Sequence, residues 1–302
     1  MTARIGVVGL GAMGGAIAAR LAAQGWAVLG FDRDAAAVER AAAEGISPAA
    51  IEQVTGVDLL ITSLPHDEIV IEVVTALAPR LERVRLVEMS TILPETMRRV
   101  TELLDGRVGE LIDAPVSGGP DEARAGALSL MVGAAAEPGP LVRSVLASLG
   151  VVNPVGGLGD GKALKLVNNL IAMGNIAVMA EGFELGAALG VEPRVIYDVV
   201  NRSGGRSNHF AKRIPWALED DFRARFAVRL AEKDLGLAAT SADALGMHLP
   251  VTDLARSRFR DAMDAGLAEE DAIALVKLYR SSGTACHPSA GPADVKGTKR
   301  EK

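Results

Sequence analysis

Short apolar runs alternate with longer, less apolar stretches along the first half of the chain. The runs have the length and composition of buried parallel strands, and Gly or Pro marks the ends of several stretches between them, as in helices. The pattern predicts strands at residues 4–9, 26–31, 58–63, 85–89, 111–114, 128–132 and 151–155, and helices at 12–24, 35–44, 67–78, 94–104 and 137–149. Strands that alternate with helices predict an α/β fold with a Rossmann-type, doubly wound parallel sheet.

The pattern changes to helix alone after Gly161. The later helices are expected at residues 162–190, 193–202, 227–246, 251–265 and 270–279. The first would be about 40 Å long, enough to cross between two domains. We therefore predict three parts, which are a dinucleotide-binding Rossmann domain at 1–161, an all-α substrate and dimerisation domain at 162–280, and a polar, disordered tail at 281–302.

Composition excludes several classes of function. The chain has 302 residues with a net charge of −6 and 3% aromatic residues, which disfavours nucleic-acid binding. The single cysteine, Cys286, excludes an intrachain disulfide and suits a reducing cytoplasm. The four histidines show no metal-ligand spacing, so no metal site is expected.

Two apolar stretches are poor candidates for membrane spans. Glycines and Arg20 interrupt the first 31 residues, and the stretch at 163–180 carries Lys165 and three asparagines, which are costly in lipid. We predict a cytoplasmic protein with no membrane partner.

A glycine-rich motif follows the first predicted strand. Gly-x-Gly-x-x-Gly between a strand and a helix gives a tight turn, close approach to a pyrophosphate and a helix N-terminus that attracts it. The residues expected to bind a dinucleotide here are Gly9, Gly11, Ala12, Met13 and Gly14. A glycine-rich turn without a ligand is the alternative.

Asp32 ends the second predicted strand, 18 residues after Gly14. A carboxylate there accepts hydrogen bonds from the ribose hydroxyls of NAD and repels the 2′-phosphate of NADP. Arg33 beside it could instead pair with that phosphate. The sequence favours NAD and leaves NADP, or a solvated turn that ignores the cofactor, open.

Lys165 is the only charged residue between Lys162 and Glu181. An ammonium rarely enters such an apolar stretch without a partner, because it loses its hydration. Asn169 lies four residues on, which places both side chains on one helix face. This convergence indicates chemistry, although a lysine that extends its head into water would fit as well.

Consecutive glycines follow a serine after the strand predicted at 111–114. Their backbone N–H groups could hold a carboxylate, with the serine hydroxyl as a further donor. The residues are Ser117, Gly118 and Gly119. The same residues could also form an ordinary tight loop that binds no ligand.

Four segments in this order resemble the β-hydroxyacid dehydrogenase family, which includes 3-hydroxyisobutyrate dehydrogenase and tartronate semialdehyde reductase. They are Gly9-Leu-Gly-Ala-Met-Gly14, Asp113-Ala-Pro-Val-Ser-Gly-Gly119, Gly157-Leu-Gly-Asp-Gly-Lys-Ala-Leu-Lys-Leu-Val-Asn-Asn169 and Lys233-Asp-Leu-Gly-Leu-Ala238. The resemblance spans residues 4 to about 280. One departure is Ala134, where the family commonly has a second glycine.

The resemblance implies a role for each matching residue. Lys165 would be the acid/base, Asn169 would help hold the substrate, and Ser117 with the two glycines would bind its carboxylate. The dinucleotide would contact Leu64, Pro65, Thr91 and, from the helical domain, Lys233. Simpler roles also fit, such as strand ends at Leu64 and Pro65, a helix cap at Thr91 and an ion pair within one helix at Lys233.

The implied reaction is hydride transfer between a nicotinamide and a small 3-hydroxy acid, with 3-hydroxyisobutyrate favoured, in a homodimer or homotetramer. Tartronate semialdehyde, L-threonate and L-serine stay open as substrates. An imine reductase usually has another residue where Lys165 stands. A dinucleotide-binding module without catalysis is the remaining alternative.

Overall fold

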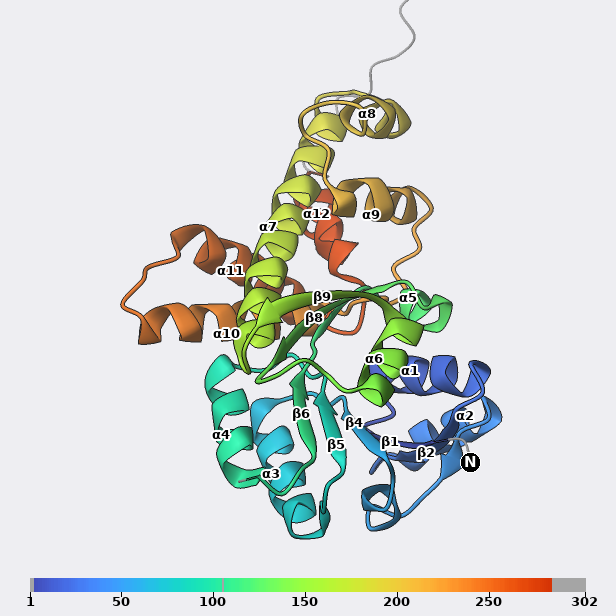
Figure 1. The fold of residues 1–302 in the computed structure, drawn as a ribbon. Coiled ribbons are helices and arrows are strands. Elements are labelled where there is room, and N and C mark those ends of the chain that lie inside the picture. Colours follow the sequence, from blue (N-terminus) through green and yellow to red (C-terminus); the bar gives the residue numbers. More distant parts are fainter. Residues whose placement is uncertain (1–2, 105, 284–302) are drawn as a thin grey trace, which may run out of the picture.

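The computed structural model describes residues 3–104 and 106–283. A nine-stranded sheet forms the lower half of the molecule, and helices form the upper half (Figure 1). The strands are β1 Arg4–Val8, β2 Ala27–Phe31, β3 Ser47–Pro48, β4 Leu59–Thr62, β5 Arg85–Glu88, β6 Glu110–Asp113, β7 Val116–Ser117, β8 Leu128–Ala134 and β9 Gly150–Gly156. The predicted α/β half followed by a helical half is confirmed.

The order in which successive strands are added to the sheet reverses at β1. The strand order is β3-β2-β1-β4-β5-β6-β8-β7, with β9 paired to β8. Val7 of β1 lies opposite Gly30 on one side and Ile61 on the other, and all three strands run parallel. In such sheets, the place where the strand order reverses leaves a crevice at the carboxyl ends of the strands.

Helices cover both faces of the sheet. They are α1 Ala12–Ala23, α2 Ala35–Ala43, α3 Asp67–Leu77, α4 Pro94–Leu104, α5 Pro120–Ala125 and α6 Pro140–Leu149, with 3-10 turns at Gln53–Thr55 and Ala78–Arg80. One face buries Ile17 of α1 and Val145 of α6, and the other buries Val70 of α3 and Met97 of α4. The strands and helices predicted for this half all occur within three residues of their expected ends.

The sheet is not parallel throughout, which corrects one expectation. β8 runs antiparallel to β6 and to β7. A parallel crossover needs about a dozen residues or more, usually with a full helix. The chain between β6 and β8 holds only the two-residue β7 and the short α5, so it turns back instead.

The second half packs around one long helix. Its helices are α7 Asp160–Ala188, α8 Pro193–Val200, α9 Asn208–Leu218, α10 Val228–Ala244, α11 Pro250–Asp264 and α12 Val276–Gly283, with a 3-10 turn at Ala272–Leu275. α7 runs the height of this half, while α10 and α11 project to one side (Figure 1). The predicted division after residue 161 falls in the first turn of α7 and stays a prediction. Cys286 and most of the predicted tail lie outside the described residues.

The sequence did not predict α9. The proline inside it, Pro215, and the glycines before it argued against a helix. Ser207 caps its first turn by accepting a hydrogen bond from Phe210 N at 3.0 Å, and that serine was the available signal.

α7 passes a length and hydropathy test for a membrane span, and 44% of its most apolar window is buried in the protein. Met173, Ile176 and Phe183 of this helix belong to the core of the helical half. Here α7 is therefore the central helix of a packed domain.

A buried ion cluster fixes the start of α7 to the sheet. Lys162 Nζ lies 2.6 Å from Glu88 Oε2 of β5 and 3.1 Å from Asp113 Oδ1 of β6, and all three side chains are 0% exposed. It also donates to Glu88 O at 2.9 Å. Asp113 Oδ2 accepts from the backbone N of Gly159 and Lys162 at 2.9 and 3.1 Å, which satisfies N–H groups at the helix start.

We predict that Lys162→Met destabilises the protein by about 3–5 kcal/mol, because it leaves two buried carboxylates without their cation. Urea denaturation measures the free energy of unfolding. Arg98→Met is the matched control, since it removes an exposed ion pair with Glu95 that is worth at most about 1 kcal/mol. Equal losses in the two variants would contradict the structural role of Lys162.

Candidate active site

A cleft of about 630 Å³ opens where the sheet meets the helical half. Its lower walls come from the ends of β1, β2, β4 and β5, and its upper wall comes from α7, α10 and the segment before α10. Thirteen of the sequence-predicted residues line it, namely Gly9, Gly11, Ala12, Met13, Gly14, Asp32, Arg33, Leu64, Pro65, Thr91, Gly118, Lys165 and Lys233. The structure therefore brings residues from seven separate segments of the chain around one space.

The glycine-rich loop is shaped by close backbone contacts. Gly9 has φ +93°, and a Cβ there would lie 2.2 Å from Ser63 O. A Cβ at Gly14 would lie 1.9 Å from Gly9 O, whereas one at Gly11 would meet nothing within 4 Å. The absence of a side chain at Gly9 and Gly14 thus lets the loop, β4 and α1 approach each other closely. Gly11 leaves open space at the start of α1, where helix N–H groups attract an anion.

Asp32 holds this loop in place through its carboxylate. Oδ2 accepts from Leu10 N at 2.6 Å and Oδ1 accepts from Asp34 N at 2.9 Å. Arg33 forms an ion pair with Glu72 of α3, and Arg40 lies 3.6 Å from Asp34. Both arginines at this end of the cleft therefore already face a carboxylate.

Lys233 joins the two halves across the cleft. Its Nζ donates to Thr91 O at 2.9 Å and to Pro65 O at 3.2 Å, and lies 3.1 Å from Asp234 Oδ1. Leu64 N donates to Ser90 Oγ at 2.8 Å, which fixes the neighbouring loop. The lysine expected near the cofactor thus also pairs with the carboxylate next to it on α10.

Lys165 is buried at the upper wall, with 8% of its surface exposed. Burial lowers the pKa of its ammonium from 10.5 to about 8. Asp234 opposes this shift, while the cations Lys233 and Lys162 add to it. A lysine whose head extends into water is excluded by this burial.

Asn169 lies behind Lys165 rather than on the cleft surface. Its Nδ2 donates to Asp234 Oδ2 at 2.5 Å, and its Oδ1 accepts from Asn168 at 3.0 Å. The lysine and the amide do share one helix face, as their spacing predicted. The contact between Asn169 and Asp234 joins α7 to α10.

The Ser-Gly-Gly loop differs in part from expectation. Gly118, with φ +130°, lines the cleft, but Ser117 and Gly119 do not. Gly119 N already donates to Glu122 Oε2 at 2.8 Å, and Glu122 pairs with Lys212 of α9. The amide of Gly119 is therefore used in capping the helix that follows, and the carboxylate-binding role expected of Gly119 stays a prediction.

The sequence reasoning gave Asp234 no role, and it did not foresee that Glu122, a residue expected near the substrate, bonds the Gly119 amide. Asp234 follows Lys233 directly in a segment already singled out, so adjacency was a signal. Glu122 stands three residues after Gly119, which is the spacing of a capping box.

His209 at the start of α9 belongs to the same electrostatic environment. Burial lowers its pKa to about 4, and the Arg213 guanidinium acts in the same direction. Arg213 Nε donates to His209 Nδ1 at 3.3 Å. The imidazole is therefore neutral at physiological pH and adds no charge near Lys165.

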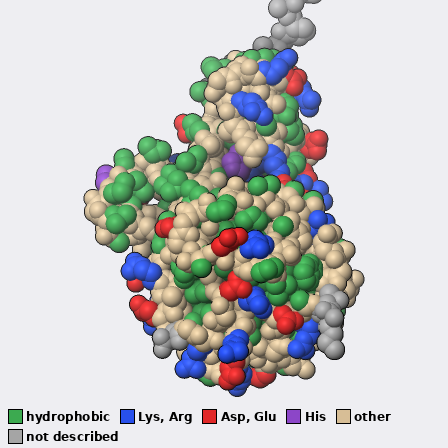
Figure 2. All heavy atoms as spheres, in the orientation of Figure 1, with side chains coloured by type: hydrophobic (Ala, Val, Ile, Leu, Met, Phe, Trp, Pro, Cys, Tyr) green, Lys and Arg blue, Asp and Glu red, His purple; other side chains and the backbone are tan. Residues whose placement is uncertain are grey.

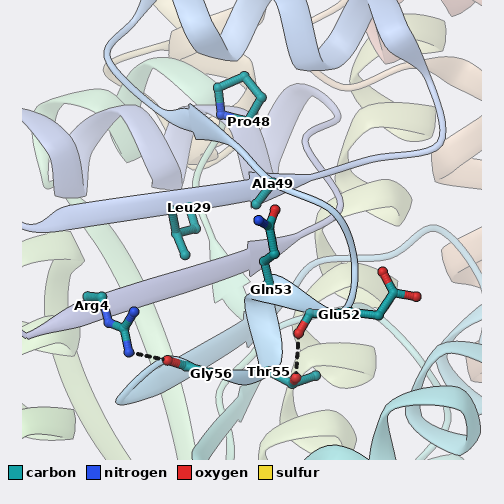
Figure 3. Close-up of a pocket in the computed structure, with 8 residues that line it drawn as sticks. All are labelled: Arg4, Leu29, Pro48, Ala49, Glu52, Gln53, Thr55 and Gly56. Atoms are coloured by element: carbon teal, nitrogen blue, oxygen red, sulfur yellow. Dashed lines mark hydrogen bonds between the residues drawn. The ribbon is translucent and has the colours of Figure 1, made fainter.

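A second hollow, of about 490 Å³, lies beside the start of β1 (Figure 3). The Arg4 side chain points to the Gly56 carbonyl, and the Thr55 hydroxyl donates to Glu52 O at 2.7 Å. The Arg4 and Thr55 side chains are thus occupied by nearby backbone. Within residues 3–104 and 106–283, no group of three or more His, Cys, Asp or Glu could hold a metal ion.

Two family models together match nearly the whole described chain. The model described as the NAD binding domain of 6-phosphogluconate dehydrogenase matches residues 4–157. The model described as NAD-binding of NADP-dependent 3-hydroxyisobutyrate dehydrogenase matches residues 159–279. The two meet where β9 leads into α7.

Individual proteins match over similar lengths. A 2-(hydroxymethyl)glutarate dehydrogenase from Eubacterium barkeri is 34% identical over 91% of this chain and 94% of its own. A 3-hydroxyisobutyrate dehydrogenase from Pseudomonas aeruginosa is 35% identical over 91% and 98%, respectively. The solved structure of Mycobacterium tuberculosis 3-hydroxyisobutyrate dehydrogenase with L-serine has a TM-score of 0.83 at 30% identity, covering 93% of this chain and 100% of that one.

We predict that Gly11→Ala weakens NADH binding at least about tenfold, because its methyl group occupies the approach to the start of α1. Its free energy of unfolding changes by at most about 1 kcal/mol, since the methyl meets no protein atom. Fluorescence titration and urea denaturation give the two quantities. Gly14→Ala, with its clash inside the protein, loses both. Unchanged binding by Gly11→Ala would place the pyrophosphate elsewhere.

Proposed function

The chain belongs to the β-hydroxyacid dehydrogenase family as an NAD(P)-dependent 3-hydroxyacid dehydrogenase, and we propose that it oxidises a small 3-hydroxy monocarboxylic acid with NAD and Lys165 as general base. The observation that carries this proposal is the buried Lys165, whose pKa is lowered to about 8 in the wall of the dinucleotide cleft. The family assignment argues against the two alternatives that the sequence left open, which are an imine reductase and a dinucleotide-binding module without catalysis.

In the oxidation direction, Lys165 is neutral and takes the proton of the substrate hydroxyl. The chemistry that NAD would supply here is acceptance of a hydride from the carbon that bears this hydroxyl, which would leave a carbonyl. Lys165 leaves the step as an ammonium and returns the proton in the reverse reaction. A pKa near the working pH lets one group serve both directions.

Gly118 N and the Ser117 hydroxyl would anchor the substrate carboxylate and set the distance between the reacting carbon and Lys165. Gly118 lines the cleft and Ser117 lies next to it in the chain, which supports this assignment. Asn169 would help to position Lys165 rather than contact the substrate, because its amide nitrogen already donates to Asp234.

The substrate we favour is 3-hydroxyisobutyrate or a similar monocarboxylate. Asp121 and Glu122 follow the carboxylate loop, and their carboxylates, that of Glu122 partly neutralised by Lys212, would disfavour a second carboxylate on the substrate. Arg124, a residue of the same short helix, pairs with Glu44 of α2 and so faces away from the cleft. The relatives' names differ in the hydroxy acid at similar identity, so the loop chemistry decides our choice.

NAD is the cofactor we propose, with Asp32 accepting from the ribose hydroxyls. Arg33 and Arg40 are the cations that could attract a 2′-phosphate, and both face carboxylates, Glu72 and Asp34. NADP would have to compete with those carboxylates.

We also propose that the protein acts in the cytoplasm as a homodimer or homotetramer through its helical half. Hydrophobic side chains gather over the projecting α10–α11 pair (Figure 2), where Leu245, Met247, Val251 and Leu254 are exposed. Exposed apolar patches of this kind are typical of protein interfaces. A monomer mass by light scattering would contradict the oligomer, and signal in a membrane or periplasmic fraction would contradict the location.

We predict that Lys165→Met lowers kcat for oxidation at least about 100-fold, the usual size of a general-base contribution, while NADH binding changes little. In the wild type, kcat/KM for oxidation rises with pH to a plateau with a midpoint near 8, because only the neutral amine accepts the proton. The reduction rate falls over the same range. Stopped-flow and steady-state assays across pH 6–10 measure these changes. Near-wild-type turnover by Lys165→Met would end this assignment.

We predict that a substrate panel gives the highest kcat/KM with 3-hydroxyisobutyrate and NAD. The panel comprises 3-hydroxyisobutyrate, L-serine, L-threonate and 2-(hydroxymethyl)glutarate, plus tartronate semialdehyde in the reduction direction, with each cofactor followed at 340 nm. Faster oxidation of the dicarboxylate would refute the role given to Glu122 and Asp121. A preference for NADP would refute that of Asp32.

A further inference from the structure

Asp234 is a buried carboxylate that the proposed reaction does not yet use. It lies on α10, is 2% exposed and reaches the cleft that Lys165 lines. Its Oδ2 accepts from Asn169 Nδ2 at 2.5 Å. Its Oδ1 lies 3.1 Å from Lys233 Nζ but accepts no hydrogen bond within the described chain. A buried carboxylate oxygen without a hydrogen bond is costly, so a donor is expected in some state of the enzyme.

The two buried lysines of α7, Lys162 and Lys165, differ in the carboxylates that lie near them. Lys162 has two carboxylates within ion-pair distance and is committed to them. Lys165, one turn later, has no carboxylate within 4 Å among the residues that the structure describes, although Asp234 acts on its charge. The ammonium formed during oxidation therefore needs a counter-charge that is near but not already bonded to it.

We infer that Asp234 is the positioning residue of the Lys165–Asn169 pair, with one oxygen holding Asn169 and the other balancing the ammonium that Lys165 becomes. The inference rests on the proposed function and adds a named partner to it. The inference adds no bond change to the proposed reaction, in which a proton passes from the substrate hydroxyl to Lys165 Nζ and a hydride from the neighbouring carbon to NAD.

The other charged groups around Lys165 cannot supply this counter-charge. Lys162 precedes it on α7, and Lys233 faces it from α10, and both are cations. His209 faces it from α9 and is neutral above pH 6, because its pKa is about 4. Asp234 is thus the one anion among the groups that act on Lys165.

Asp234 also connects this charge to the contact between the two halves. Lys233 donates to the carbonyls of Pro65 and Thr91, on the sheet side of the cleft, while it lies beside Asp234. A cofactor that displaces Lys233 from those carbonyls would change how much of the Asp234 charge is available to Lys165. Binding and proton affinity are then coupled through two adjacent residues.

The test is Asp234→Asn, which keeps an oxygen that can accept from Asn169 and removes the charge. The negative charge raises the pKa of Lys165, so its loss moves the midpoint of the oxidation profile about one unit lower, as expected for one nearby opposite charge. Well above the midpoint, reduction then slows about tenfold, because the ammonium form is rarer. Asp234→Glu retains the charge and keeps the midpoint near that of wild type.

Three controls keep the outcomes separate. Asp243→Asn removes an exposed carboxylate from the same helix and should leave the profile unchanged. NADH titration and thermal melting report binding and folding for each variant, and Asp234→Ala replaces Asp234→Asn if the latter does not fold. Lower activity with an unshifted midpoint would overturn the inference while Lys165 kept its role. Full turnover by Lys165→Met would instead overturn the proposed function itself.

Discussion

The buried contact of Lys162 with Glu88 and Asp113 is the constraint on which the rest of the molecule depends. Three charges leave water together, which is tolerated only because each finds a partner and the cluster has further hydrogen bonds. The contact joins the first turn of α7 to the ends of two adjacent strands. The end of β5 leads into Met89, Ser90 and Thr91, which line the cleft. One ion cluster therefore fixes both the direction of the long helix and one wall of the site below it.

The same helix shows how burial gives different results for the same residue type. Lys162 lies within ion-pair distance of two carboxylates and fixes the start of α7 to the sheet. Lys165, one turn on, is nearly as buried but lacks a bonded carboxylate, so desolvation lowers its pKa to about 8. The helix brings this amine over the dinucleotide cleft only because its start is fixed. In the proposed function, structural and chemical roles are thus divided between two lysines three residues apart.

Local patterns in the sequence were sufficient for most of the elements, although not for α9 or the short β3, β7 and α5, and for the residues that carry a motif. The spacing of Lys165 and Asn169 places them on one face, and Gly9, Gly11 and Gly14 form the expected turn. What the sequence could not show depends on contacts between distant segments. Asp234 meets Asn169 across 65 positions, and Lys162 meets Glu88 across 74. The direction of β8 and the use of Gly119 N by Glu122 likewise follow from how a short connection folds. Arg33 reads as a free cation in the sequence, and only packing shows Glu72 beside it.

A crystal structure of the protein with NAD and a slowly reacting 3-hydroxy acid tests the central claim most directly. The account predicts the substrate hydroxyl within hydrogen-bond distance of Lys165 Nζ, about 2.6–3.2 Å. It also predicts the carboxylate at Ser117 and Gly118, with the pyrophosphate at the start of α1. A hydroxyl oriented toward another side chain, with Lys165 directed away from the reacting carbon, would contradict it.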